Sequence, residues 1–131
     1  KTELATLARR IDDAEMIHNP NVVKVVMAAG GKALYFSRCP IPYGRGLAPE
    51  VWPNQHAYYK HIGMYAYRAD VLARITSLPP SSLELAESLE QLRWLENGYS
   101  IQVALTDKDT IGIDTPEDLL HAQEVLRDKD F

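Results

Sequence analysis

The sequence predicts an α/β fold, a mixed sheet with flanking helices, and three observations support this prediction. Strand-like and helical patterns follow one another in the order strand, strand, loop, strand, helix, helix, strand, helix. The 131 residues are 46% hydrophobic, which suffices for one core at the usual size of a domain. No internal repeat or low-complexity tract interrupts the pattern, so we expect a single domain over residues 1–131.

A β-hairpin is expected near the start of the chain. The pattern of residues 3–11 is too mixed to assign, but Asn19-Pro20-Asn21 is a turn signal before a β-branched run at 22–26. Gly30-Gly31 permits a chain reversal, and residues 33–37 then read as the returning strand.

A long loop is expected after the hairpin, because prolines and glycines argue against regular structure before His56. Loops of this length in compact domains are usually functional or disordered. The loop is therefore a candidate for substrate contact or subunit packing, and Trp52 favours packing.

The second half of the chain predicts one strand and then two helices. Aromatic and small residues alternate over 59–67, so an extended strand would place Tyr59, His61, Gly63, Tyr65 and Tyr67 on one face. A short helix is expected from Asp70 to about Leu78, before Pro79-Pro80. Ser81 and Glu84 form a capping-box signature for a second helix that continues to about Glu96 on a stripe of leucines.

The last two elements have the clearest signals. Residues 99–105 alternate as a half-buried strand. Thr115 is a good N-cap and Pro116 suits the first helical position, so a helix starts there. Its apolar stripe is expected to face the core: Leu119, Ala122 and Leu126.

Composition excludes several classes of protein. The net charge of -4 and the lack of clustered Lys and Arg argue against nucleic-acid binding. Cys39 is the single cysteine, and no apolar run approaches the roughly 20 residues that cross a bilayer, so a cytoplasmic protein with no membrane partner is expected. The phosphate-binding signatures G-x-G-x-x-G and G-x-x-x-x-G-K-[ST] are absent. The chain begins at Lys1, so we expect it to be processed or cut from a longer protein.

His61 and Tyr65 are candidate ligand residues. They lie about 13 Å apart along a strand face, a spacing that would line a groove for a polyhydroxylated ligand. The alternative is aromatic packing against a helix, with His61 hydrogen-bonded in place.

Glu90 and Gln91 adjoin the apolar stripe of their helix, where they could offer hydrogen bonds to sugar hydroxyls. The alternative for Glu90 is a solvated ion pair with Arg93.

Asp114 and Arg38 are candidates for charged ligands. Asp114 precedes a helix N-terminus, which favours an ionised carboxylate, and it would suit Mg²⁺ or serve as an auxiliary cap. Arg38 ends a strand, where its planar fork would bind a carboxylate or phosphate, or form a structural ion pair.

Five phrases of the sequence resemble a known family, the 3-deoxy-manno-octulosonate (Kdo) cytidylyltransferases. They occur in family order across nearly the whole chain: Asn19-Pro-Asn-Val-Val-Lys-Val-Val, Leu34-Tyr-Phe-Ser-Arg, His61-Ile-Gly-Met-Tyr-Ala-Tyr-Arg, Leu89-Glu-Gln-Leu-Arg and Gly112-Ile-Asp-Thr-Pro-Glu-Asp-Leu. The resemblance implies part of a Rossmann-like nucleotide-diphospho-sugar transferase fold that lacks its amino-terminal nucleotide-binding half. The chain would be the acceptor-sugar-binding and dimerisation part, inactive alone.

The resemblance also implies a reaction and a site. CTP and Kdo would combine into CMP-Kdo and pyrophosphate for lipopolysaccharide synthesis, with Mg²⁺ as cofactor, in a homodimer. Carried over by motif, Asp114 would be a catalytic metal ligand, and five residues would contact Kdo: Arg38, His61, Tyr65, Glu90 and Gln91. Cys39 and the loop from Tyr43 to Gln55 depart from the family pattern.

Two alternatives remain open from the sequence. One is a non-catalytic dimerisation or sugar-binding module, for which the missing phosphate loop argues. The other is a cytidylyltransferase for another acidic sugar, such as sialic acid. The phrases His61-Ile-Gly-Met-Tyr and Leu89-Glu-Gln-Leu-Arg favour Kdo over that sugar.

Overall fold

The fold is built on a five-stranded mixed sheet. The computed structural model describes residues 2–108, 113 and 115–127. The strands lie in the order β3-β2-β4-β1-β5, with bounds β1 Leu4–Ile11, β2 Lys24–Met27, β3 Ala33–Ser37, β4 Tyr58–Tyr67 and β5 Ile101–Leu105. β1 and β5 pair in parallel, whereas the other neighbours pair antiparallel. The expected mixed sheet and its hairpin, β2 with β3, are thus confirmed.

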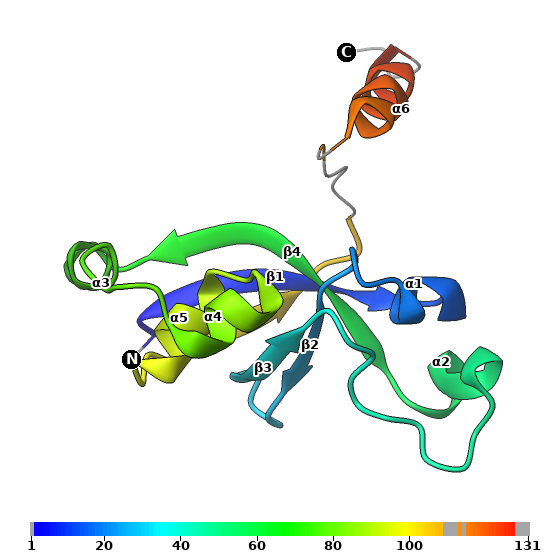
Figure 1. The fold of residues 1–131 in the computed structure, drawn as a ribbon, viewed down its shortest axis with the longest axis horizontal. Helices are drawn as coiled ribbons and strands as arrows, with labels where there is room; N and C mark the ends of the chain where they lie inside the picture. Colours follow the sequence, from blue (N-terminus) through cyan, green and yellow to red (C-terminus); the bar gives the residue numbers. More distant parts are fainter. Residues whose placement is uncertain (1, 109–112, 114, 128–131) are drawn as a thin grey trace.

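Short helices flank this sheet, and α6 stands apart from it (Figure 1). Their bounds are α1 Ala14–His18, the 3₁₀ helix η1 Pro49–Val51, α2 Trp52–Gln55, α3 Ala69–Ile75, α4 Ser82–Glu87, α5 Gln91–Glu96 and α6 Pro116–Arg127. Leu92 and Trp94 of α5 share the main core with Val25 of β2 and Phe36 of β3. α5 therefore covers one face of the sheet. No helix of the described ranges is long and apolar enough to cross a membrane.

β1 lies inside the sheet although its sequence pattern was too mixed to assign. It pairs with β4 on one side and with β5 on the other. Leu4, Thr6 and Ala8 are buried, while the charged Arg9 and Arg10 are not. A polar residue among the inward positions hides the period that identifies a strand, so only the pairing partners reveal β1.

The expected loop is partly wrong. The segment before His56 contains η1 and α2, which follow a run without regular structure. Trp52 is buried and stacks on Tyr58 at 6.1 Å between ring centroids. Its indole N–H donates to the Leu47 carbonyl at 3.2 Å. Trp52 thus organises a second, small core within the chain and does not offer apolar surface for subunit packing.

The single helix expected up to Glu96 is in fact two helices. Ser88 has a left-handed backbone with φ 55°, which ends α4 before α5 begins. Glu87, the last residue of α4, accepts hydrogen bonds from the Ser37 hydroxyl at 2.7 Å and from the Arg38 amide at 2.8 Å. These contacts hold the end of α4 against the end of β3. The spacing of the leucines could not predict them, because they join residues far apart in the sequence. α3 likewise ends at Ile75, earlier than expected.

Replacing Ser88 with glycine tests the strain at this break. Glycine adopts a positive φ at little cost, so Ser88→Gly is expected to raise the free energy of unfolding by about 0.5 kcal/mol after its larger chain entropy is subtracted. Urea unfolding of the two proteins measures the difference. Ser88→Ala, which keeps the strain, should give no gain. A loss of stability in Ser88→Gly would contradict the assignment.

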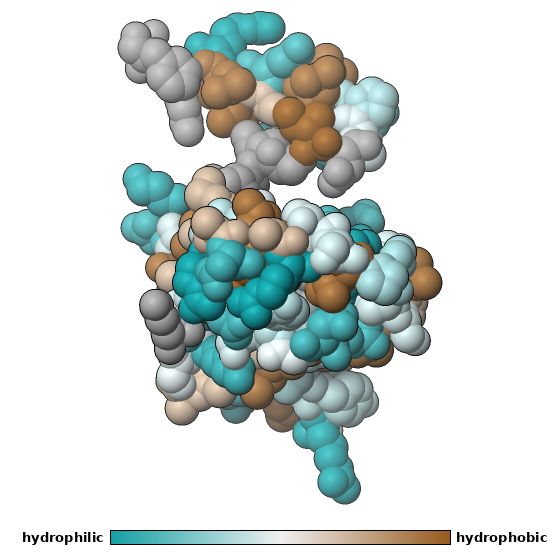
Figure 2. Space-filling model, turned by 90° about the vertical axis from the view of Figure 1, so that its left-hand side faces the viewer, coloured by the Kyte–Doolittle hydropathy of each residue, from teal (hydrophilic) through white to brown (hydrophobic). Residues whose placement is uncertain are grey.

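α6 starts as expected but does not pack as expected. Thr115 and Asp118 cap it reciprocally, each backbone amide donating to the other's side chain at 3.0–3.1 Å. The helix stands apart from the sheet, and Figure 2 shows apolar surface on it. Leu119 and Leu126 are exposed and only Ala122 is buried, so the core-facing stripe is wrong. Leu119 and Leu126 are exposed because α6 does not pack against the sheet.

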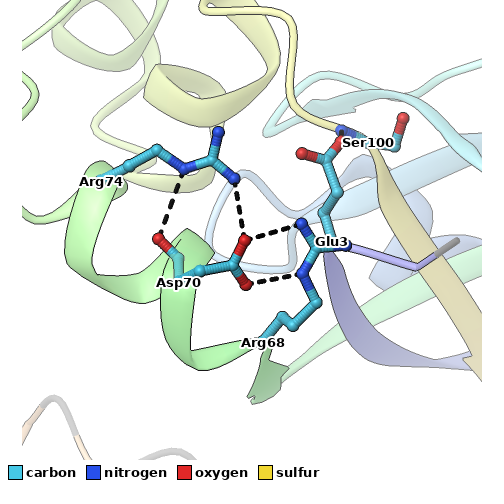
Figure 3. A network of polar contacts seen from close by, with 5 residues as sticks. All are labelled: Glu3, Arg68, Asp70, Arg74 and Ser100. Atoms are coloured by element: carbon cyan, nitrogen blue, oxygen red, sulfur yellow. Dashed lines mark hydrogen bonds and ion pairs between the residues drawn. The ribbon is translucent and has the colours of Figure 1, made fainter.

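Polar contacts gather where α3 lies beside the residues that precede β1 and β5 and follow β4 (Figure 3). Asp70 of α3 accepts from Arg68 at 2.6 and 2.8 Å and from Arg74 at 3.3 Å. Hydrogen bonding by Arg68 lowers the pKa of Asp70 to about 2. Glu3 accepts from the Ser100 amide at 3.2 Å. Because Asp70 is exposed, its ion pairs orient α3 and contribute little stability.

Candidate functional site

The site is built on an irregularity in β4. Thr6 of β1 pairs with Tyr65, but the next residue, Leu7, pairs with Ile62. Gly63 and Met64 of β4 therefore have no partner in this pairing, and they form a bulge in the strand. The rings of His61 and Tyr65 come into contact, with centroids 5.5 Å apart. The groove-spanning separation expected from a regular strand is replaced by adjacent rings.

An aromatic row connects β4 to its neighbours. Tyr65 meets Trp94 of α5 edge-on at 5.1 Å between centroids, and Tyr67 meets the same indole at 5.9 Å. His61 meets Phe36 of β3 at 4.9 Å. The expected alternative, aromatic packing against a helix, is confirmed. The packing of these rings leaves the Tyr65 hydroxyl available to a ligand. Tyr65 makes no hydrogen bond within the described residues, and its hydroxyl is not among the buried atoms that lack a partner.

Glu90 and Gln91 lie at the start of α5, beside this row. Arg93 donates to Glu84 at 2.6 and 2.7 Å, so the expected ion pair between Glu90 and Arg93 is wrong. Glu90 instead borders a cleft of ≈ 200 Å³ that Tyr67 and Trp94 also line.

Gln91 is 6% exposed. Its amide has no hydrogen-bond partner among the described residues, although the amide atoms reach the surface. Buried amides normally have hydrogen-bond partners, so the Gln91 side chain is a candidate to bind a polar group of a ligand.

Arg38 approaches the same region from the end of β3. Its guanidinium donates to three carbonyl oxygens, those of Glu87 at 2.7 Å, Pro20 at 3.1 Å and Ser88 at 3.2 Å. The expected alternative of a side-chain ion pair is thus replaced by carbonyl contacts. A guanidinium has five N–H groups, so two remain for a ligand.

Electrostatics make the β4 part of the site neutral. Burial lowers the pKa of His61 to about 4. Burial also raises the pKa of Tyr65, with smaller contributions from Tyr67 and Glu90. At neutral pH the imidazole is therefore uncharged and the phenol protonated. Both groups can exchange hydrogen bonds with hydroxyl groups without a charge being buried.

Asp114 lies outside the described residues, so its place relative to the site stays a prediction. Thr115 and Asp118 cap α6 reciprocally, and both readings of Asp114, a metal ligand or an auxiliary cap, stay predictions. Within residues 2–108, 113 and 115–127, no three His, Cys, Asp or Glu side chains gather as a metal site.

Sequence reasoning missed three residues that support the site. Thr6 contacts His61, Trp94 carries the aromatic row, and Glu87 holds the end of β3. Thr6 lay in a segment with no assignable period, whereas Trp94 and Glu87 looked like ordinary helix positions. A larger hollow of ≈ 530 Å³ lies between the β2–β3 turn and β5 and contains none of the predicted residues.

Comparison with known proteins gives consistent similarities. A family model described as cytidylyltransferase matches residues 1–105. Proteins named 3-deoxy-manno-octulosonate cytidylyltransferase are similar: one from Cytophaga hutchinsonii is 62% identical over 90% of this chain and 48% of its own length. Another, from Bacteroides thetaiotaomicron, is 56% identical over 98% of this chain and 52% of its own. The chain thus spans about half the length of the curated relatives it matches.

A solved structure is similar in fold as well as in sequence. It is titled as CMP:2-keto-3-deoxy-manno-octonic acid synthetase complexed with CTP. Its TM-score with this chain is 0.84 at 40% identity, over 96% of this chain and 49% of that one. The similarity confirms the expected fold class, a mixed sheet with flanking helices of the nucleotidyltransferase type.

Proposed function

This chain belongs to the cytidylyltransferase family, and on that premise we propose that its full-length protein couples CTP and Kdo to give CMP-Kdo and pyrophosphate. The observation that carries the proposal is the identity of 56–62% with relatives of that name over 90–98% of the chain. The reaction would serve lipopolysaccharide synthesis in the cytoplasm. A homodimer is part of the proposal, as is the inactivity of this chain alone.

The proposal assigns the Kdo side to this chain. Kdo carries several hydroxyl groups and one carboxylate. The Tyr65 phenol would donate to a sugar hydroxyl, the Gln91 amide can donate and accept, and the Glu90 carboxylate accepts from hydroxyls. The two remaining N–H groups of Arg38 suit the sugar carboxylate. His61 completes the set as a neutral partner.

These residues would act by orientation. Several directional hydrogen bonds fix the sugar so that its anomeric hydroxyl meets the α-phosphorus of CTP, which converts a bimolecular encounter into a positioned one. Asp114 would hold Mg²⁺, which when bound supplies positive charge against the phosphates.

Removing the Tyr65 hydroxyl tests the Kdo side. Tyr65→Phe in the full-length protein is expected to raise KM for Kdo about tenfold and to leave KM for CTP unchanged, because one hydrogen bond to the sugar is lost. Steady-state pyrophosphate release measures both constants. Tyr59→Phe is the matched control, since it removes the same group from the same strand, at a residue that lines the hollow of the β2–β3 turn and not the cleft beside Glu90. Equal effects of the two changes would remove Tyr65 from the site.

The function itself is tested by the choice of sugar. The full-length protein, supplied with CTP and Mg²⁺, should release pyrophosphate with Kdo and form CMP-Kdo detectable by mass spectrometry. Sialic acid in place of Kdo should give release at least a hundredfold slower if the polar groups match only one sugar. Activity with sialic acid alone would assign a different acceptor, and absence of product with both would favour a non-catalytic module.

A further inference from the structure

The hydroxyl group of Thr6 sits at the centre of the β4 bulge. It lies 2.8 Å from the Met64 carbonyl, 3.2 Å from the Ile62 carbonyl and 2.9 Å from Nε2 of His61. Thr6 itself is 3% exposed, so its hydroxyl group has little access to water. Three partners therefore share one hydroxyl group inside the protein.

The chemistry of these partners fixes the direction of each hydrogen bond. A threonine hydroxyl has one proton to donate, and carbonyl oxygens only accept. If the proton goes to Met64 at 2.8 Å, the oxygen lone pairs are left for His61, and Nε2 must carry the proton of that bond. The reverse arrangement would turn the hydroxyl proton away from the carbonyls of Met64 and Ile62, so both would lose the hydrogen bond from Thr6.

The other ring nitrogen of His61 is available. Within the described residues Nδ1 has no hydrogen-bond partner, and it is not among the buried atoms that lack one, so it reaches the surface. A proton on Nε2 of a neutral ring leaves Nδ1 with a lone pair. The lowered pKa of His61 keeps the ring neutral at physiological pH.

We propose that Thr6 is a positioning residue, which holds His61 as the Nε2–H tautomer so that Nδ1 accepts a hydrogen bond from a hydroxyl of the bound sugar. The sugar part of this inference rests on the proposed function, but the tautomer does not. The bulge has a role in this arrangement. Its extra residues bring the Met64 carbonyl to the Thr6 hydroxyl, and this carbonyl takes the proton that would otherwise be offered to His61.

The tautomer can be measured without a ligand. The full-length protein, with ¹⁵N-labelled histidine, is studied by long-range ¹H–¹⁵N NMR at neutral pH, and the His61→Gln variant identifies which histidine signals belong to His61. We expect a protonated Nε2 and an unprotonated Nδ1 in the wild type. Thr6→Val keeps the shape but lacks the hydroxyl, so both nitrogens should shift toward a mixture of tautomers. Thr6→Ser keeps the hydroxyl and should retain the single tautomer.

Kdo binding gives the second readout. Calorimetric titration should show a dissociation constant about tenfold higher for Thr6→Val than for the wild type, with Thr6→Ser close to the wild type. A wild-type ring protonated at Nδ1, or a tautomer unchanged in Thr6→Val, would overturn the proposal. If the wild type binds no Kdo, the proposed function fails, and the NMR spectra still decide the role of Thr6. If Thr6→Val does not fold, the wild-type spectrum and Thr6→Ser still decide.

Discussion

Asp114→Asn is expected to lower turnover of the full-length protein by about 10²–10³-fold, while stability changes little. The change removes one negative charge and keeps the size of the side chain. If Asp114 is a metal ligand, as the resemblance implies, the site loses the charge that favours Mg²⁺. If Asp114 were only a cap, asparagine would serve as well and turnover would be nearly normal. Pyrophosphate release over a range of Mg²⁺ concentrations measures the effect.

The matched control is the neighbouring residue. Thr115 and Asp118 cap α6, so Thr115→Ala should reduce the stability of the helix end by about 1 kcal/mol and affect turnover far less than Asp114→Asn. Thermal unfolding and turnover are measured on both variants. If the two roles are separate, Thr115→Ala loses mainly stability and Asp114→Asn loses mainly turnover. Near-normal turnover of Asp114→Asn with unchanged Mg²⁺ dependence would make Asp114 a structural residue.

Lys24→Met is expected to lower the free energy of unfolding by about 3 kcal/mol. Lys24 is fully buried in β2, and its ammonium group donates to the carbonyls of Asn19 at 2.9 Å, Val22 at 2.5 Å and Arg38 at 2.6 Å. Burial lowers its pKa to about 8, so the ammonium form predominates at neutral pH with three N–H groups for three acceptors. Methionine fills the space but leaves these carbonyls without their donor, and each unmet group costs about 1–3 kcal/mol.

Urea unfolding of the full-length protein measures this loss. Lys32→Met is the control, because it makes the same replacement at an exposed position of the β2–β3 turn and should change stability by less than about 0.5 kcal/mol. Lys24→Met should also loosen Arg38, whose backbone carbonyl is one of the three acceptors, and so raise KM for Kdo. A stability loss equal to that of Lys32→Met would show that the carbonyls find other partners.

The hairpin and β5 were predictable because their strands and turns have local sequence signals. Gly30-Gly31 separates the β-branched run at 22–26 from the apolar residues of 33–37, and the alternation over 99–105 has one face to bury. The start of α6 was predictable for the same reason, since Thr115 and Pro116 act within one turn. β1 was not assigned, because Thr6 occupies an inward position that only the carbonyls of another strand make favourable.

The sequence by itself determined the mixed fold class, the order of most elements and, through its family phrases, the candidate residues for a sugar. Only the tertiary structure decided how these residues meet. The bulge of β4 brings the rings of His61 and Tyr65 together, and the contact of Glu87 with the end of β3 accompanies the break at Ser88 that starts α5 beside them. Both features depend on hydrogen bonds between residues more than 45 positions apart. Such hydrogen bonds produce no periodic pattern in the sequence, because the packing of the sheet determines which residues become partners.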